Sequence, residues 1–390
     1  MVISAEVGTP AQRFRLKLDS THTYMWIGEC VESEGCLRHS RYIPTLSATS
    51  IPLGIYDAEV KPGLYGTLWQ ENMVLAGHAT PHQNFCSVDK GVMSDDLYEM
   101  MVYDGSLPIM FGFEGESLHK TILSALHDQG VIGQEIAGVY MAKLPHSFGE
   151  LLIGGWAPER CTHPPTWHAR MEIEGFTGWS FLGTHVTYVH EVLGRENAFL
   201  GNPRRGQETA EDVDERDPIL VTIALGSPVI TGPVDVVNGI LDSMEEDRPA
   251  FGDVVRCGDD RAARWPRLEF RIGDEEYFLD GNDYLIPVDN GFCFVALHGD
   301  DFEDFEHGMW VLGTPFVRKY YSILNHKDDT IGLCHANHTH DDELPEQFDD
   351  SPSESVDSDD VGSSASQPQK SVVTGGEVEG VGDGDNVSVD

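Results

Sequence analysis

One acidic side chain stands where a carboxylate could perform acid-base chemistry. Asp19 follows the strand-like segment RFRLKL and precedes two hydroxyl side chains, Ser20 and Thr21. A positioned carboxylate can act as a general base toward a bound water. An aspartate followed by small polar residues is also typical of a turn. Asp19 taken alone therefore assigns no chemistry.

A second group of reactive side chains lies in the segment CHANHTH. It contains residue types that bind zinc or copper: Cys334, His335, His338 and His340. Short histidine tracts of this kind usually bind metal only adventitiously. This tract also stands where the folded part of the chain gives way to an acidic tail. We therefore expect no metal site and no cofactor.

An internal repeat points to two related lobes. KLDSTHTYMWIG is followed by DGSLPIMFGF in the first half, and IALGSPVITGP is followed by MWVLGTPFVRKYY in the second. Each pair joins a strand and a small polar turn to two apolar residues and a glycine. The spacings agree, with 93 residues from Asp19 to Gly112 and 89 from Ala224 to Gly313. A chain of 390 residues also exceeds one ordinary hydrophobic core.

The first 340 residues have the pattern of a mostly β protein with short helices. β-branched and aromatic runs bounded by glycine, proline and aspartate predict strands at RFRLKL, GELLIGG, PILVTIAL, RLEFRI and CFVAL. Apolar spacing predicts short helices in HKTILSALHDQG and PVDVVNGILDSM. The polar stretch 195–217 predicts a long surface loop.

Charge and composition exclude several classes of partner. The chain has 25 basic and 66 acidic residues, a formal net charge of -41, so it repels nucleic acid and anionic membranes. It has no apolar run long enough to span a membrane, and the first residues do not resemble a secretory signal. Residues 341–390 hold 15 acidic residues against one lysine, which predicts a disordered acidic tail.

Several motifs, in order, resemble the pepsin-like aspartic proteases. VGTPAQRFRLKLDS is similar to the family's first catalytic strand, with Asp19 at the aspartate of its Asp-Thr-Gly turn. GELLIGGWAPERC resembles the crossing between lobes, and GMWVLGTPFVRKYYSILNHKDDTIGLC resembles the C-terminal signature. The resemblance implies a bilobal β fold. Its N-terminal lobe would span 1–163 with a shortened first strand, its C-terminal lobe 164–340, and the tail 341–390.

The resemblance implies hydrolysis of peptides in a cleft between the lobes. One aspartate from each lobe would share a proton and activate a water, without metal. Counted back from 231–233, however, the second motif reads Ala224-Leu225-Gly226-Ser227, so Ala224 occupies the aspartate's place. A methyl group neither accepts a proton nor orients a water. We therefore expect hydrolysis to be impaired or lost.

The first turn and the flap depart from the family as well. Ser20 and Thr21 stand for the family's threonine and glycine, and a β-branched residue at the glycine position should perturb the turn. Ser20 keeps the hydroxyl that bonds across the lobes, whereas Leu225 has none. The family's flap tyrosine aligns with Glu59 if no gap is allowed, or with Tyr56 if there is an insertion.

Of the seven cysteines, Cys30 and Cys36 lie close together in ECVESEGC, a spacing that suits a small disulfide loop in an oxidising compartment, whereas the others could equally be buried thiols. The resemblance implies the disulfides Cys30–Cys36 and Cys257–Cys293. Three further cysteines match no bridge of the family: Cys86, Cys161 and Cys334. This odd number indicates at least one free thiol or an intermolecular bond. An extracellular or acidic vacuolar location follows from the resemblance.

Two functions from different classes remain open. The chain is either a pepsin-like endopeptidase with impaired or absent activity, or a non-catalytic module that holds a peptide or protein in the cleft, as an inhibitor or decoy would. We expect a monomer in both cases. Cleavage of an unfolded protein at acidic pH that depends on Asp19 would distinguish the two.

Overall fold

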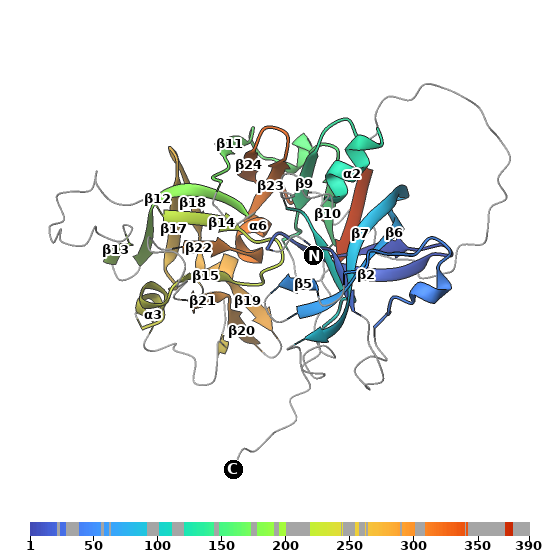
Figure 1. Ribbon diagram of the computed structural model, residues 1–390. Helices are drawn as coiled ribbons and strands as arrows, with labels where there is room; N and C mark the ends of the chain where they lie inside the picture. Colours follow the sequence, from blue (N-terminus) through green and yellow to red (C-terminus); the bar gives the residue numbers. More distant parts are fainter. Residues whose placement is uncertain are drawn as a thin grey trace, which may run out of the picture.

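Two sheets lying side by side dominate the computed structural model, and the resulting bilobal, mostly β fold confirms the predicted fold class (Figure 1). The described residues are 1–390 without 22–23, 29–38, 56–57, 62–63, 92–100, 111–120, 144–147, 173–177, 191–194, 200–218, 243, 245–253, 257–261, 263, 289–290, 301–308, 340, 342–370 and 377–390. No helix among the described residues is long and apolar enough to cross a membrane.

The larger sheet has 14 strands and contains the predicted first catalytic strand. Its members in chain order are β1 (Val2–Val7), β2 (Gln12–Asp19), β3 (Trp26–Gly28), β4 (Ile51–Pro52), β5 (Ala58–Lys61), β6 (Leu64–Leu75), β7 (His78–Gly91), β8 (Gly105–Pro108), β9 (Ile136–Tyr140), β10 (Phe148–Ile153), β11 (Thr166–Ala169), β23 (Tyr320–Asn325), β24 (Thr330–His335) and β25 (Ser371–Gly376).

The second sheet has eight strands, and a small three-stranded sheet accompanies it. The eight are β12 (Trp179–His190), β13 (Arg195–Phe199), β14 (Ile219–Ile223), β15 (Ile230–Pro233), β17 (Arg267–Ile272), β18 (Glu275–Leu279), β21 (Leu297–Asp300) and β22 (Met309–Leu312). The three are β16 (Val254–Arg256), β19 (Leu285–Val288) and β20 (Phe292–Val295). The described α-helices are α2 (Ile122–Asp128), α3 (Val234–Asp242), α5 (Gly281–Tyr284) and α6 (Thr314–Lys319).

The predicted strands and helices are confirmed. In β2 the apolar residues Phe14, Leu16 and Leu18 are buried and alternate with charged ones, as one half-buried face requires. Strand β14 is buried along its whole length, which explains its continuous apolar run. Both predicted helices form, as α2 and α3, and the side chain of Thr121 caps the start of α2.

The internal repeat corresponds to a repeated strand arrangement. β2 runs parallel to β8, which pairs antiparallel with β3. β14 likewise runs parallel to β22, which pairs antiparallel with β15. In the second unit Gly232 lies so close to Trp310 that an added Cβ would come within 2.5 Å of its ring, which explains the glycine there. The two halves therefore build the same local structure.

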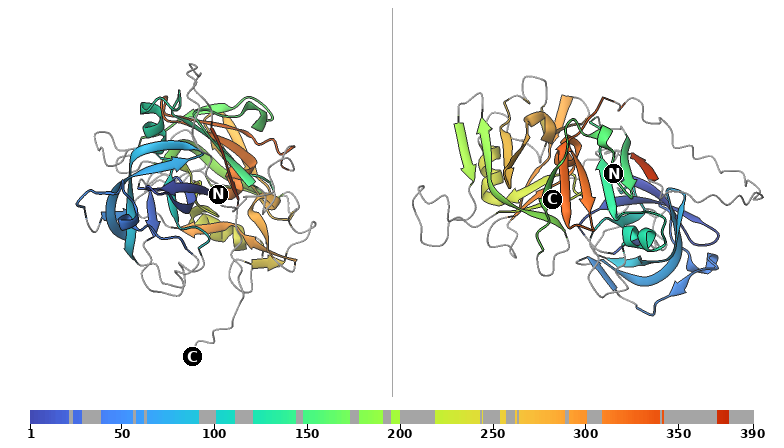
Figure 2. Two further views of the ribbon diagram at one scale, coloured as in Figure 1. Left: turned by 90° about the vertical axis from the view of Figure 1, so that its right-hand side faces the viewer. Right: turned by 90° about the horizontal axis from the view of Figure 1, so that it is seen from above.

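Strands from distant parts of the chain meet between the two lobes. β23, which comes late in the chain, pairs with β9 and with β24, and β9 in turn pairs with β10 (Figure 2). The second half of the chain thus contributes strands to the sheet that begins with β1. The backbone hydrogen bonds between these paired strands therefore join the two lobes.

Two stretches differ from the sequence prediction. The predicted loop 195–217 is wrong for its first five residues, because β13 pairs with β12 from Val186↔Phe199 to His190↔Arg195. Within the predicted disordered tail 341–390, the segment Ser371–Gly376 forms β25. Its run of two valines and a threonine favours a strand, whereas the acidic residues of the tail do not.

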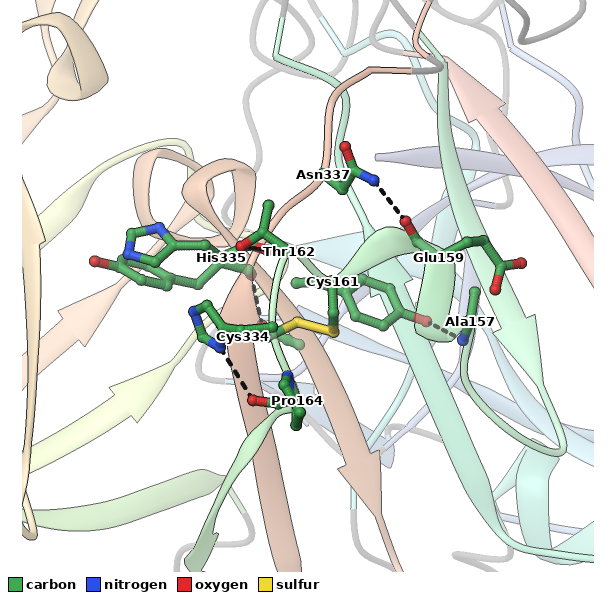
Figure 3. Close-up of a disulfide and its surroundings, with 12 residues drawn as sticks. Ala157, Glu159, Cys161, Thr162, Pro164, Cys334, His335 and Asn337 are labelled. Carbon is green, nitrogen blue, oxygen red and sulfur yellow. Dashed lines mark hydrogen bonds between the residues drawn. A yellow bond between two sulfur atoms is a disulfide. The ribbon is translucent and has the colours of Figure 1, made fainter.

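One cysteine pair in the structure is additional to those that the resemblance implies. Cys161 and Cys334, which match no family bridge, form a disulfide across a sequence separation of 173 residues (Figure 3). The sequence left the partners of these two cysteines open, and the structure pairs them with each other. Cys293 is disulfide-bonded as expected, but its predicted partner Cys257 lies outside the described residues. The expected pair of Cys30 and Cys36 lies outside them too, and Cys86 is a buried thiol.

The histidines near the disulfide have structural contacts. The sulfur of Cys334 is committed to the disulfide and cannot ligate a metal as a thiolate. The His335 ring packs on Tyr320 at 4.7 Å between centroids. Nε2 of His338 lies 3.0 Å from the carbonyl oxygen of Arg318. His335 and His338 thus have structural contacts in the fold, whereas His340 lies outside the described residues.

Removal of the disulfide should destabilise the protein strongly. The double variant Cys161→Ala/Cys334→Ala should lose about 3–5 kcal/mol of unfolding free energy, because the bridge closes a very long loop. Urea unfolding followed by tryptophan fluorescence measures this loss. The variant Cys86→Ala serves as the control, since its stability should still drop on addition of reductant. Equal stability of oxidised wild type and double variant would contradict the prediction.

Candidate active site

Two equivalent turns meet where the lobes face each other. The first follows β2 and begins at Asp19, and the second follows β14 and begins at Ala224. The carbonyl oxygen of Asp19 accepts a hydrogen bond of 2.7 Å from Ile109, next to β8. The Ala224 N–H donates one of 3.1 Å to Leu312, in β22. Each turn is thus fixed by the neighbouring parallel strand of its own sheet.

A buried serine joins the two turns. The Ser20 hydroxyl donates to the carbonyl oxygen of Ile223 at 2.9 Å and accepts from the backbone N–H of Leu225 at 2.9 Å. Ser20 is fully buried, and so is the apolar side chain of Leu225. The arrangement is one-sided: the Ser20 hydroxyl of the first turn bonds to the second turn, and Leu225 has no hydroxyl to return the bond.

Both carboxylate oxygens of Asp19 are engaged. Oδ1 accepts hydrogen bonds from the Thr21 backbone N–H at 2.8 Å and from the Thr21 hydroxyl at 2.5 Å. Oδ2 forms an ion pair with the ammonium group of Lys17 at 3.2 Å. The residue itself is only 3% exposed. The threonine that replaces the family's glycine therefore adds a second donor to Asp19.

Lys17 is the site residue that the sequence analysis missed. It lies two positions before Asp19 in β2, and residues two apart in a strand project to the same face. This spacing is the signal that could have identified it. Its ammonium group also lies 5.6 Å from the centre of the Tyr103 ring. Burial raises the pKa of Tyr103, Lys17 lowers it and Asp19 raises it, with a net upward shift.

The second turn brings no carboxylate to the site. Ala224 is fully buried. A Cβ placed on Gly226 would lie 2.4 Å from Oδ2 of Asp19 and 2.7 Å from Cε of Lys17, so this turn lies directly against the ion pair. A glycine at this position is required by that close approach. The carboxylate of Asp19, the ammonium group of Lys17 and the backbone of Gly226 therefore meet here.

The remaining predicted site residues have local roles or lie outside the described part. The Ser227 hydroxyl donates to the carbonyl oxygen of Val229 at 2.9 Å, which closes the second turn. Strands β5 and β6 form a hairpin in the region expected for the flap, and Glu59 pairs with Tyr65 within it. Tyr56 lies outside the described residues. The choice between Tyr56 and Glu59 as the flap residue stays a prediction.

A tryptophan and a histidine support the first turn from the other lobe. The indole N–H of Trp179, in β12, donates to the carbonyl oxygen of Ile109 at 2.7 Å. The ring of His326 packs edge-on against Trp179, 4.9 Å between centroids. Burial, with a smaller effect from Arg170, lowers the pKa of His326 to about 3. The folded state therefore keeps this imidazole neutral at mildly acidic pH.

The fold and the paired turns define the class of the protein. A profile of the eukaryotic aspartyl proteases matches residues 2–336, and the chain belongs to this family. It is 22% identical to pepsin A of Bos taurus over 338 residues, covering 84% of this chain and 82% of that one. It is 23% identical to renin of Canis lupus familiaris over 339 residues, 85% and 77% of the two chains.

Loss of the bridging hydroxyl should loosen the contact between the turns. Ser20→Ala leaves the buried N–H of Leu225 and the carbonyl of Ile223 without this partner, so we expect a loss of about 2–4 kcal/mol in unfolding free energy. Chemical denaturation measures it. Ser20→Thr keeps the hydroxyl and is the matched control. A Ser20→Ala variant as stable as Ser20→Thr would contradict this role.

Stability should fall on acidification because of His326. An unfolded histidine binds a proton below about pH 6.5, whereas the folded one stays neutral to about pH 3. The unfolded state therefore binds more protons across that window, and stability decreases as pH falls, by up to about 1.4 kcal/mol per unit. Denaturation between pH 7 and pH 4 should show a shallower slope for His326→Gln. An unchanged slope would contradict the assignment.

Proposed function

We propose that this chain retains the peptide-binding architecture of the aspartyl proteases but has lost, or nearly lost, peptide hydrolysis. The observation that supports this is the 3.2 Å ion pair between Lys17 and Asp19. It lies against the second turn, which begins with the buried Ala224. A carboxylate paired with an ammonium takes the place of two carboxylates.

Hydrolysis by this family needs two acid-base groups that exchange roles. Two carboxylates close together hold one proton between them, so one can accept a proton from water while the other donates to the substrate. Asp19 can supply only one of these groups. The loss of a positioned acid-base partner typically lowers a rate by about 10²–10⁴. Ala224 therefore accounts for a severe loss even with the scaffold intact.

Lys17 adds a second obstacle at the same position. An ammonium group carries three donors and no acceptor, so it cannot replace a carboxylate as the acceptor for a water proton. It also engages Oδ2 of Asp19, the oxygen that lies nearest the second turn. Restoring an aspartate at position 224 alone would place a new carboxylate beside this ammonium. We infer that both changes together disable the site.

The second candidate, a non-catalytic module that binds a peptide or protein, is favoured by the intact connection between the turns. Ser20 keeps both bridging hydrogen bonds although the acid-base pair is gone. A scaffold maintained in this way can still hold an extended peptide between the lobes. Binding without cleavage is thus the function that we propose for the wild-type chain, acting as a monomer.

The disulfides and His326 favour an extracellular location over an acidic vacuole. Cys161, Cys293 and Cys334 are disulfide-bonded, which suits an oxidising compartment. The low pKa of His326 makes the folded state less stable in acid than near neutral pH. An extracellular location near neutral pH therefore fits these features better than an acidic vacuole.

Reconstruction of the pair should require two substitutions. We expect Ala224→Asp alone to give no cleavage of an acid-unfolded protein, because Lys17 would pair with the new carboxylate. Lys17→Val/Ala224→Asp should cleave at least about 10²-fold faster than Ala224→Asp, and a pepstatin-like inhibitor should block it. Product formation is measured by mass spectrometry at acidic pH, after confirming that each variant is folded.

Controls separate this result from contaminating proteases and test the proposal itself. Adding Asp19→Asn to the double variant should abolish the new cleavage. Cleavage by the wild type that Asp19→Asn removes would show that the native site is active, and the proposal would be wrong. Equal rates for Ala224→Asp and the double variant would disprove the role of Lys17. Retention of the pepstatin-like inhibitor by inactive wild type would support binding without cleavage.

A further inference from the structure

Strand β25 connects the tail to two strands that are otherwise not neighbours. Its residues pair antiparallel with β10 along the full strand, from Phe148↔Gly376 to Ile153↔Ser371. At its end it also meets β1, at Val2↔Gly376. The strand appears dark red in Figure 1, beside β10. A segment near the C-terminus therefore lies between the first strand of the chain and the strands that join the two lobes.

The outer edge of β10 needs a partner. On its other side β10 pairs with β9, from Glu150↔Tyr140 to Ile153↔Ala137. Leu151 and Ile153 are almost completely buried with β25 in place. A strand in such surroundings would expose unpaired backbone groups if the neighbouring strand were absent, which is costly when those groups are shielded from water. This edge is thus suited to take up an extended chain.

The tail contains one segment that fits this edge. Val372, Val373 and Thr374 are its only run of three β-branched residues, and β25 carries no charged side chain. The tail around it is strongly acidic, and acidic residues are poor strand formers. From Asp341 to Ser371 the chain has 30 residues to cover the distance, a reach of roughly 100 Å when extended. The segment can therefore reach the edge within one molecule.

We propose that the outer edge of β10 is a binding site for an extended, uncharged, β-branched peptide strand, and that Ser371–Gly376 occupies it as a tethered ligand of the same chain. β25 pairs along its length with β10 alone and touches β1 at one register position, so it is held mainly from one side. Tethering supplies a high effective concentration, about millimolar for a flexible linker. A free peptide of the same sequence therefore competes poorly until the tethered strand is displaced. This site is independent of whether the chain hydrolyses peptides.

Proline substitution in the full-length chain tests the proposal. Val373→Pro removes a backbone donor from β25 and disfavours strand pairing, whereas Ala365→Pro changes the tail outside β25. Hydrogen exchange should show loss of protection at residues 148–153 in Val373→Pro only. A synthetic peptide spanning residues 368–379 should bind Val373→Pro at least tenfold more tightly than wild type, and should restore that protection. Equal protection in wild type and Val373→Pro, or equal peptide affinity, would overturn the proposal.

A disulfide trap tests the register without weakening the strand. Leu152 lies opposite Val372, so oxidation of Leu152→Cys/Val372→Cys should link the two positions, as detected by peptide mapping. Leu152→Cys/Val373→Cys is the matched control, because Val373 is shifted by one residue and faces the other side of the sheet. No preference for the first pair would overturn the proposal. A link found only in covalent dimers would identify a second copy as the occupant, and would overturn the intramolecular assignment.

Discussion

The hydroxyl of Ser20 holds the two halves of the site in register. It donates to one backbone group of the second turn and accepts from another, and both bonds are buried. No second hydroxyl comes from Leu225, which contributes apolar burial instead. The side-chain hydrogen bonds that hold the two turns together therefore both come from Ser20 of the first turn. The packing of the two turns therefore does not depend on a pair of carboxylates, because the turns still meet although only one of them carries a carboxylate.

The lysine beside Asp19 gives the site a different electrostatic character from that of a carboxylate pair. Two carboxylates at short range favour a shared proton, so their chemistry suits acidic solution. A carboxylate and an ammonium neutralise each other and need no such proton. His326 is in keeping with this, because burial holds it neutral and makes acidification unfavourable for the fold. Both the charge pair at the site and the pH dependence of stability thus favour function near neutral pH over function in acidic solution.

Much of the fold could be predicted from the sequence, because the strands around Asp19 and Ala224 carry strong apolar patterns on both sides of a repeat. The one-sided role of Ser20 also followed from residue type. Lys17 was missed because a lysine in a half-buried strand is usually an exposed residue, although its spacing of two from Asp19 in β2 places both side chains on one face. The pairing of Cys161 with Cys334 depends on β24 lying beside the lobe crossing, which spacing cannot reveal. β25 was hidden because the surrounding tail is acidic.

The disulfide between Cys161 and Cys334 makes a covalent ring of the whole intervening chain (Figure 3). The described strands from β11 to β24 belong to this ring. A single proteolytic cut inside it, for example in the polar stretch 200–218, would leave the two pieces attached. The nicked molecule would migrate as one species until reductant is added. The chain between Cys161 and Cys334, which includes the turn at Ala224, is thus protected against separation by a single proteolytic cut.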